Sequence, residues 1–505
     1  MHYKLNLMAK IPSGSLQEIF FGSSDKSKSA ELNSLEKQGL INKIAPRIYS
    51  SKIGEDPAFV VKRNWFRVLS HQYPNAIISH RSALEFKPTP EGHIYLTYTY
   101  SNKVDLPGLT IHFLKGHGSI KGDTPLFEYL YVSQEARAYL ENMEPSRKKG
   151  DESKSLPLEE IEEKLETIIR IKGEGALNKI RDSAREISKL LQMENEYNKL
   201  NHLISAMLSS GAPKNLKSQV ARARVSGEPF DKDRIELFEN LYEDLAGKIF
   251  PDYLDKNDTQ KFYKNFAFFE SYFSNYIEGT EFEVSEAKKI ILTETPMASR
   301  NEDSHDILGT YQIVSDKYEM SRIPTSADAL LELLRERHAI LLGSRISKKP
   351  GEFKTTNNRA GNTEFVDWQL VTGTLKKGYE WYSLLQHPFA KATFVMFLVS
   401  EVHPFLDGNG RMARIMMNAE LSSKGFSKII IPNVYREDYL VSLKKLTRQR
   451  ITEPYIRMLL RAYEFSSNIF DENLDAMENY LLKCDAFQEP KEGKLRIIAR
   501  LPPSP

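Results

Sequence analysis

The segment HPFLDGNGRMAR, residues 403–414, gathers side chains that suit phosphate chemistry. His403 titrates near neutral pH and would take a proton from an incoming hydroxyl. Asp407 offers the hard oxygen ligand that suits Mg²⁺ bridging phosphates. Arg411 and Arg414 are three residues apart, so on a helix they share one face and can bind phosphate oxygens. A base, a metal ligand and two cations so close together indicate transfer from a nucleoside triphosphate.

The same segment contains a glycine-rich turn. Gly408 and Gly410 flank Asn409, so the backbone can turn sharply and present its N–H groups. Such a turn at a helix N-terminus attracts phosphate, because free N–H groups and the helix dipole both favour an anion. Each feature by itself is ordinary, since a lone GNG is most often a turn and two arginines on one face are most often solvated. Their joint occurrence favours a functional site.

Two helices must hold this turn in place. The apolar residues before it predict a helix that ends just before Pro404, and a helix with apolar Ile415 follows it directly. More widely, residues 231–473 follow a helical pattern except around 348–367. The sequence therefore predicts a mostly α-helical catalytic part.

HPFLDGNGRMAR resembles the Fic motif, HPFx[DE]GNGRxxR, with every defining position filled. The resemblance implies the Fic fold, ATP as co-substrate, Mg²⁺, and transfer of AMP to a Ser, Thr or Tyr hydroxyl of a target protein. Spacing alone supports phosphate binding, whereas the choice of adenylyl over phosphoryl transfer comes from the resemblance. The roles that it implies are general base for His403, Mg²⁺ ligand for Asp407, α- and β-phosphate contacts for Gly408, Asn409 and Gly410, phosphate-chain contact for Arg411 and γ-phosphate contact for Arg414.

An upstream helix near 259–279 ends in SNYIEG, which is similar to the inhibitory motif of the same family, [ST]xxxE[GN]. Glu278 would pair with Arg414 and withdraw the cation that should hold the γ-phosphate. Ser274, one helical turn earlier, would steady Glu278 on the same face. The competing interpretation is an ordinary helix end with Gly279 as its C-cap. We expect autoinhibition, and Glu278 positioning water for removal of AMP is left open.

Residues 350–361 resemble the β-hairpin flap that Fic proteins carry beside the target hydroxyl. Asn358, Gly361 and Asn362 are turn formers. A flap would hold an extended target segment by strand addition. The proline-rich stretch that usually follows the flap is missing, since EFVDW stands there (364–368), so the mode of target docking is left open.

Two tyrosines after the motif, Tyr435 and Tyr439, are candidates for an adenine pocket. Aromatic residues at helical spacing are more often part of a core. Both interpretations are kept.

The first 145 residues read as mixed α and β. Within them, residues 27–49 predict a small helix followed by a hairpin, with cations around it between residues 26 and 52. This pattern suits a winged helix-turn-helix on a phosphate backbone, although a solvated basic helix fits equally well. The candidate DNA-binding residues are Lys28, Lys37, Lys43 and Arg47.

LEKQGLINKIAPRIY and the later AIISHRSALEF resemble AbiEi-type antitoxin-like regulators. The resemblance implies a winged helix with an α/β domain behind it. His80 lies in this region, and we interpret it as a packing or capping residue, because no acid or nucleophile is signalled beside it.

The 505 residues include 70 Lys and Arg against 68 Asp and Glu, and the formal net charge of +2 excludes a strongly basic nucleic-acid coat. The single cysteine, Cys484, excludes an internal disulfide and a Cys-rich zinc site. No apolar run approaches the ~20 residues of a membrane span, and the first ten residues lack a signal-peptide core. We expect a cytoplasmic protein without a membrane partner; a homo-oligomer is left open.

The predicted fold class is multidomain: a mostly α Fic core with a small β-hairpin flap, preceded by an α+β region containing a winged helix. The expected parts are a regulator-like region (1–145), a linker and helical connector (146–230), the Fic domain (231–473) and a C-terminal tail (474–505).

Two rival functions remain beside adenylyl transfer. One is a DNA-binding regulator whose Fic domain senses nucleotide. The other is a Fic enzyme that transfers a different phosphate-containing group.

Overall fold

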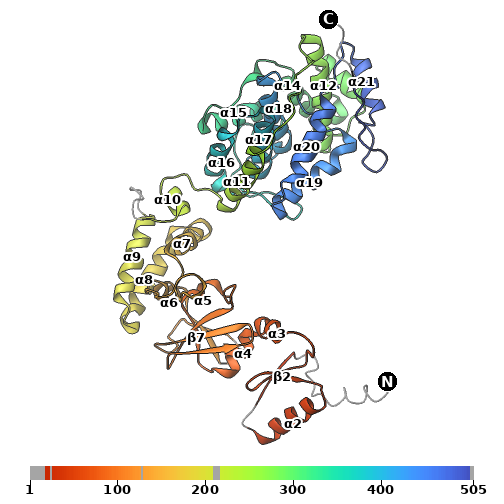
Figure 1. Ribbon diagram of the computed structural model, residues 1–505. Helices are drawn as coiled ribbons and strands as arrows, with labels where there is room; N and C mark the ends of the chain where they lie inside the picture. Colours follow the sequence, from red (N-terminus) through yellow and green to blue (C-terminus); the bar gives the residue numbers. More distant parts are fainter. Residues whose placement is uncertain (1–17, 23–24, 127–128, 209–215, 501–505) are drawn as a thin grey trace. The chain divides into compact units, whose positions relative to one another are not determined.

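The chain forms two compact units in the computed structural model, and they divide between Val225 and Ser226 (Figure 1). Each unit buries apolar cores of its own. The Fic-like motif lies in the second unit. The structure describes residues 18–22, 25–126, 129–208 and 216–500.

The first unit begins with mixed α and β structure. A three-stranded antiparallel sheet has the order β1-β3-β2, and a six-stranded mixed sheet has the order β6-β7-β5-β4-β9-β8. Leu109, Ile111 and Phe113 of β7 are buried in alternation, because successive strand residues face opposite sides of a sheet. The strands are β1 (Ile19–Phe21), β2 (Asn42–Ala45), β3 (Ile48–Ser50), β4 (Ile77–Ile78), β5 (His93–Tyr98), β6 (Asn102–Leu106), β7 (Leu109–Lys115), β8 (Thr124–Leu126) and β9 (Leu130–Val132).

The helix and hairpin expected in residues 27–49 are present as α2, β2 and β3. Asp25 caps α2 by accepting a hydrogen bond from the Ser27 N–H at 2.8 Å. The helices of the first unit are α2 (Lys26–Lys37), α3 (Pro57–Arg63), α4 (Trp65–Gln72), α5 (His80–Glu85), α6 (Glu135–Asn142), α7 (Leu158–Lys172), α8 (Glu174–Leu191), α9 (Glu194–Leu208) and α10 (Gln219–Val225), with a 3₁₀ turn at Gly150–Glu152.

The helical connector expected in residues 146–230 is not a separate part. Helices α7 to α10 pack with α6 around one apolar core. Leu165, Leu177 and Leu200 are fully buried in it. Because these helices are amphipathic and their apolar faces meet those of α6, most of the predicted connector belongs to the first unit.

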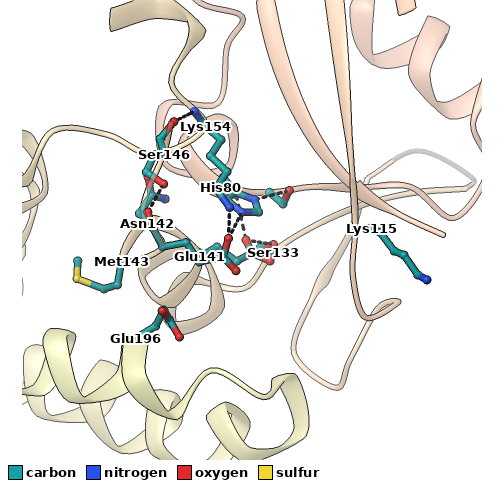
Figure 2. A network of polar contacts seen from close by, with 12 residues as sticks. His80, Lys115, Ser133, Glu141, Asn142, Met143, Ser146, Lys154 and Glu196 are labelled. Atoms are coloured by element: carbon teal, nitrogen blue, oxygen red, sulfur yellow. Dashed lines mark hydrogen bonds and ion pairs between the residues drawn. The ribbon is translucent and has the colours of Figure 1, made fainter. Parts of the chain in front are cut away.

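His80 begins α5 in a left-handed conformation, with a φ of 53°. It lies in a polar network (Figure 2), where its backbone N–H donates to Glu141 Oε2 at 3.0 Å. Ser133 Oγ donates to the same oxygen at 2.8 Å, and Glu144 Oε2 lies 3.3 Å from His80 Nε2. These contacts tie the start of α5 to α6 and to the residues beside it. They also place two carboxylates against His80, which the sequence did not signal.

The second unit is almost wholly helical and has α17 at its centre, packed against α11, α16 and α18. Apolar residues occur on every side of α17, so it is buried along nearly its whole length. Among the described residues, every helix falls short of the length and apolar character that a bilayer crossing requires. The long elements are α11 (Lys232–Ala246), α12 (Gln260–Ile277), α13 (Val284–Thr293), α14 (Asn301–Val314), α15 (Ala327–Leu341), α16 (Val371–Leu384), α17 (Pro388–Val402), α18 (Asn409–Ser423), α19 (Arg436–Gln449), α20 (Glu453–Ser466) and α21 (Leu474–Lys483).

Short elements complete the second unit. They are the strands β10 (Arg359–Ala360) and β11 (Thr363–Glu364) and the 3₁₀ turns at Ala298–Arg300, Glu319–Ser321, Ile346–Lys348, Trp368–Leu370 and Asn433–Tyr435.

Much of the tail expected in residues 474–505 packs on this unit. Met477, Leu481 and Cys484 are fully buried in its core, and Leu495 is also buried there. The apolar spacing of α21 explains the packing, since its buried residues face one side. The last five residues, 501–505, lie outside the described part of the chain.

Candidate active site

The motif forms a helix, a turn and a helix, as predicted. α17 ends at Val402, and His403 caps it in a left-handed conformation with a φ of 52°. Gly408 takes a φ of 74°, which favours glycine, and is the N-cap of α18. The turn therefore places His403 and the N-terminus of α18 at the two ends of one short loop.

His403 is held as a neutral base. Its Nδ1 lies 3.2 Å from the Ser400 carbonyl oxygen, so a proton on Nδ1 leaves the Nε2 lone pair free to accept another. The ring stacks on Phe365, with centroids 3.6 Å apart and planes 6° apart. The pKa of His403 is lowered to about 4, chiefly by burial and also by the nearby Lys354 ammonium, while the Ser400 carbonyl, Glu278 and Asp407 oppose the shift.

Asp407 is held as a carboxylate. Burial raises the pKa of this carboxyl, but the Gly408 amide, Arg411 and Lys348 outweigh burial and bring the pKa below its ordinary value. The Gly408 N–H donates to Oδ1 at 2.7 Å, and Lys348 Nζ lies 3.4 Å from Oδ2. The described residues contain no cluster of three or more His, Cys, Asp or Glu that could hold a metal by themselves. A single carboxylate still fits Mg²⁺, because this ion completes its shell with water and phosphate oxygens.

A glutamate occupies the anion site at the N-terminus of α18. Arg414 Nη2 donates to Glu278 Oε1 at 2.7 Å. A Cβ added to Gly410 would lie 2.2 Å from the same oxygen, so only glycine allows this approach. Burial raises the pKa of Glu278, but the Arg414 guanidinium lowers it more, which keeps the carboxylate charged. The carboxylate therefore takes the place where backbone N–H groups and the helix dipole favour an anion.

Arg414 is buried among partners from α12 and α19. Its Nε donates to Ser274 Oγ at 3.0 Å and its Nη2 to the Ser274 carbonyl at 2.8 Å. Its Nη1 lies 3.4 Å from the Tyr439 hydroxyl. Ser274 was expected to steady Glu278, and its hydroxyl contacts Arg414, the residue that also binds Glu278. Glu278 lies one residue beyond the end of α12, and its side chain reaches α18 directly.

Residues 328–421 match the model of the Fic/DOC family, and this stretch includes the whole motif. The chain contains a Fic domain. It is similar to protein adenylyltransferase Fic of Drosophila sechellia, with 24% identity over 273 residues that cover 51% of this chain and 53% of the relative. The Drosophila willistoni protein of the same name is 26% identical over 213 residues, which cover 41% of this chain and 42% of the relative. The chain spans about half the length of these curated relatives.

Solved structures with Fic domains are also similar to part of the chain. A Fic domain containing signaling protein from Bacteroides thetaiotaomicron has a TM-score of 0.36 and 20% identity, covering 48% of this chain and 97% of that protein. Fic-1 from C. elegans has a TM-score of 0.35 and 16% identity, covering 65% of this chain and 97% of that one.

Two motif residues of the Fic domain face inward. Asn409 Oδ1 accepts from the Phe405 N–H and its Nδ2 donates to the Phe405 carbonyl, both at 2.9 Å. Arg411 Nη1 lies 2.8 Å from Asp306 Oδ2 and donates to Asn275 Oδ1 at 3.3 Å. The sequence predicts phosphate contacts for both side chains, whereas here Asn409 closes the loop and Arg411 is paired inside the protein.

Gly279 has a φ of 90° and follows the last helical turn of α12. Its N–H donates to the Tyr276 carbonyl at 3.0 Å, and the Thr280 N–H donates to the Asn275 carbonyl at 3.1 Å. The glycine thus ends the helix, as its C-cap interpretation expects. By ending the helix here it also lets Glu278 turn toward α18.

The expected hairpin is present as β10 and β11, with Gly361 at a φ of 57°. Gly361 and Asn362 are exposed at its tip. Asn358 was expected on the docking face, but it ties the base of the hairpin to the catalytic loop. Its Nδ2 donates to the Phe405 carbonyl at 2.9 Å, and its Oδ1 accepts from Lys354 Nζ at 2.7 Å.

Sequence reasoning missed His338 of α15. Its Nδ1 accepts from the Gly351 N–H at 2.9 Å, and its Nε2 lies 3.1 Å from the Asp407 carbonyl. Its ring stacks on Phe405 at 3.7 Å between centroids. Burial lowers its pKa to about 4, so it stays neutral with the proton on Nε2. A lone histidine in a helical pattern carries no signal of such a role.

Lys354 and Asp306 were missed for the same reason. The Lys354 N–H donates to the Pro404 carbonyl at 2.8 Å, and burial lowers the pKa of its ammonium to about 8. Asp306 holds Arg411 and also Arg345, whose Nη2 donates to Asp306 Oδ2 at 2.7 Å. Both residues position motif residues from outside the motif.

The two tyrosines have separate surroundings. Tyr439 is buried beside Arg414, within the site. Tyr435 lines a cavity of about 690 Å³ together with residues of α19 and α20, such as Lys445 and Arg457. No residue of the Fic motif lines that cavity. The prediction of one adenine pocket holding both tyrosines is therefore not supported by their placement.

Proposed function

We propose that this protein is an autoinhibited protein adenylyltransferase that moves AMP from ATP to a Ser, Thr or Tyr hydroxyl of a target protein. The observation that carries the proposal is the pairing of a neutral base, His403, with an anion site that Glu278 occupies. The names of the similar Drosophila proteins support adenylyl transfer over other phosphate chemistry.

The reaction follows from the placement of the side chains. His403 Nε2 accepts the proton of the target hydroxyl, and the freed oxygen attacks the α-phosphorus of ATP. The new bond from oxygen to the α-phosphorus forms as the bond from the α-phosphorus to the bridging oxygen breaks, and pyrophosphate leaves. Asp407 would hold Mg²⁺, which supplies neutralising charge on the phosphates. The N–H groups at the N-terminus of α18, whose N-cap is Gly408, bind the phosphate oxygens.

Inhibition follows from competition for one cation. Arg414 would hold the γ-phosphate, but its guanidinium is engaged by Glu278 and Ser274. The Glu278 carboxylate also repels an incoming phosphate from the space above Gly410. ATP bound beside an engaged Arg414 lacks its γ-phosphate contact, so its α-phosphate is not aligned for in-line attack.

The test uses ATP labelled at the α-phosphate and the full chain with host lysate. Glu278→Gly is expected to raise protein labelling by roughly tenfold or more, because it frees Arg414 to bind the γ-phosphate. A hydrogen bond between charged groups is worth about 1.5–3 kcal/mol. Adding His403→Ala should abolish the labelling. Glu281→Gly is the matched control, since Glu281 is exposed three residues along the chain. Transfer of label from the γ-phosphate would instead favour phosphoryl transfer.

Removal of AMP is a second reaction of the same site. Glu278 lies beside the site with a side chain one-third exposed, so it could orient a water molecule toward an AMP-modified hydroxyl. A modified target incubated with the wild-type chain would release AMP if this holds. Retention of the AMP by the wild-type chain would restrict Glu278 to inhibition.

A second candidate function is DNA binding by the first unit. Four cations of α2 and its hairpin are exposed and make no ion pair among the described residues, which favours contact with a phosphate backbone. The test is a gel shift with the DNA upstream of the gene, run at two salt concentrations with and without ATP. Binding that weakens with salt and is lost in a fourfold alanine variant would support it, and no binding at low salt would contradict it. The four residues are Lys28, Lys37, Lys43 and Arg47.

A further inference from the structure

The inhibitory helix contacts the catalytic helix with a regular spacing. Glu270 and Ser274 are four residues apart on α12, and Glu278 follows after four more. Residues four apart lie on one helix face, so these three side chains form a row. The row meets a second row on α18, which has the same spacing and runs in the opposite direction. The facing pairs are Glu270 with Asn418, Ser274 with Arg414, and Glu278 with Gly410.

Each pair of this α12–α18 ladder is in direct contact. Asn418 Nδ2 donates to Glu270 Oε1 at 2.8 Å. Arg414 Nε donates to Ser274 Oγ at 3.0 Å. At the third pair, the Glu278 carboxylate fills the space that a Cβ on residue 410 would need. The ladder therefore sets the position of α12 along α18, because a shift of one turn would break all three pairs.

The end of the ladder away from the site is anchored by a buried ion pair. Lys428 Nζ donates to Glu270 Oε2 at 2.6 Å, and both side chains are at most 5% exposed. The ammonium also lies over the rings of Tyr263 and Phe266, at 4.1 and 4.9 Å. All three of its partners belong to α12. This anchor is two helical turns from Glu278 and touches no residue that would contact ATP.

We propose that Glu270 and Lys428 are positioning residues for inhibition: they hold α12 at the one register in which Glu278 reaches Arg414. The proposal rests on the proposed function of the same site. A buried ion pair in low dielectric is well suited to fix a register, because any displacement leaves a charge without its partner. Loosening this anchor should then release Arg414 for the γ-phosphate without any change in the catalytic residues.

The test replaces the anchor by apolar groups of similar length, in the double variant Glu270→Met/Lys428→Met. Methionine packs well against aromatic rings, and such a replacement of a buried ion pair commonly keeps the fold. Transfer from α-labelled ATP is expected to rise roughly threefold or more above wild type, because the anchor residues and Glu278 belong to one network and their effects are coupled. ATP affinity, measured by calorimetry, should move toward that of Glu278→Gly. In the Glu278→Gly background the double variant should cause no further change.

A second variant and a control complete the design. Glu270→Gln keeps the shape of the side chain and should move both measurements in the same direction by a smaller amount. Ser271→Ala removes a contact of α12 with α14, since Ser271 Oγ donates to the Ile307 carbonyl at 2.9 Å, and should leave both measurements unchanged. Thermal melting monitors folding in every variant.

The outcomes separate the two proposals. Wild-type transfer and wild-type ATP affinity in a folded double variant would overturn the positioning role, as would a further rise in the Glu278→Gly background. If Glu278→Gly itself labels no protein, the proposed adenylyl transfer fails. The shift in ATP affinity then still decides whether Glu270 and Lys428 control access to Arg414.

Discussion

At the scale of single residues, the site depends on a histidine that stays neutral and an aspartate that stays charged. His403 is neutral because burial and the Lys354 ammonium disfavour its proton. Asp407 stays charged although it is partly buried, because the Gly408 N–H and two cations stabilise the carboxylate. These charge states fit the roles proposed for the two residues, a general base and a Mg²⁺ ligand.

The first prediction concerns pH. Since the pKa of His403 is lowered to about 4, its basic form persists as the pH falls to about 5. An ordinary histidine would be only roughly one-tenth neutral at pH 5.5. We expect AMP transfer by Glu278→Gly at pH 5.5 to stay within about twofold of its rate at pH 7. A tenfold fall over this range, in protein whose circular dichroism is unchanged, would contradict the assignment.

At the scale of elements, the loop between α17 and α18, residues 403–408, is held by elements that are distant in the sequence. α15 supports it through His338, and the base of the hairpin supports it through Asn358. Both contacts end on backbone carbonyls, those of Asp407 and Phe405. The loop thus owes its shape to hydrogen bonds that fix its backbone, in addition to its own glycines.

The second prediction tests this support with His338→Phe. Phenylalanine keeps the stacking on Phe405 but loses two hydrogen bonds, each worth about 0.5–1.5 kcal/mol. We expect the melting temperature to fall and kcat in the Glu278→Gly background to fall by roughly tenfold, because the Asp407 carbonyl loses its donor. His305→Phe is the control, since no hydrogen bond of the His305 side chain is found within the described part of the chain. Unchanged kcat in a folded His338→Phe protein would argue against the role.

At the scale of the whole molecule, the two units separate the proposed chemistry from the candidate DNA surface. Every proposed active-site and inhibitory residue lies between Glu270 and Tyr439, in the second unit. The core of that unit runs from Leu237 to Leu495 and includes no residue of the first unit. Each unit therefore has the buried apolar surface that independent folding requires.

The third prediction follows from this division. A fragment of residues 226–505 should fold by itself and, with Glu278→Gly, transfer AMP at a rate within about threefold of the full chain. Circular dichroism and labelling with α-labelled ATP provide the measurements. An unfolded fragment, or a folded one without activity when the full chain is active, would show that the first unit contributes to the site.

The sequence by itself determined the parts of this protein that follow local rules. The helix end before Pro404, the turn at Gly408 and the shared face of Arg411 and Arg414 depend on residues within a few positions of one another, so spacing is sufficient to predict them. The match to the Fic/DOC family model confirmed the resemblance that these residues carry.

The tertiary structure alone decided which partners these residues have. Three of these contacts join residues that are between 69 and 148 positions apart: Asp306 with Arg411, His338 with Asp407, and Glu270 with Asn418. Single charged or aromatic residues so far apart in the sequence give no signal of contact. The same holds for α21 and for helices α7 to α10, whose packing partners no local pattern in the sequence indicates. Local geometry is encoded by neighbours in the chain, whereas long-range pairing is set by how whole helices bury their apolar faces.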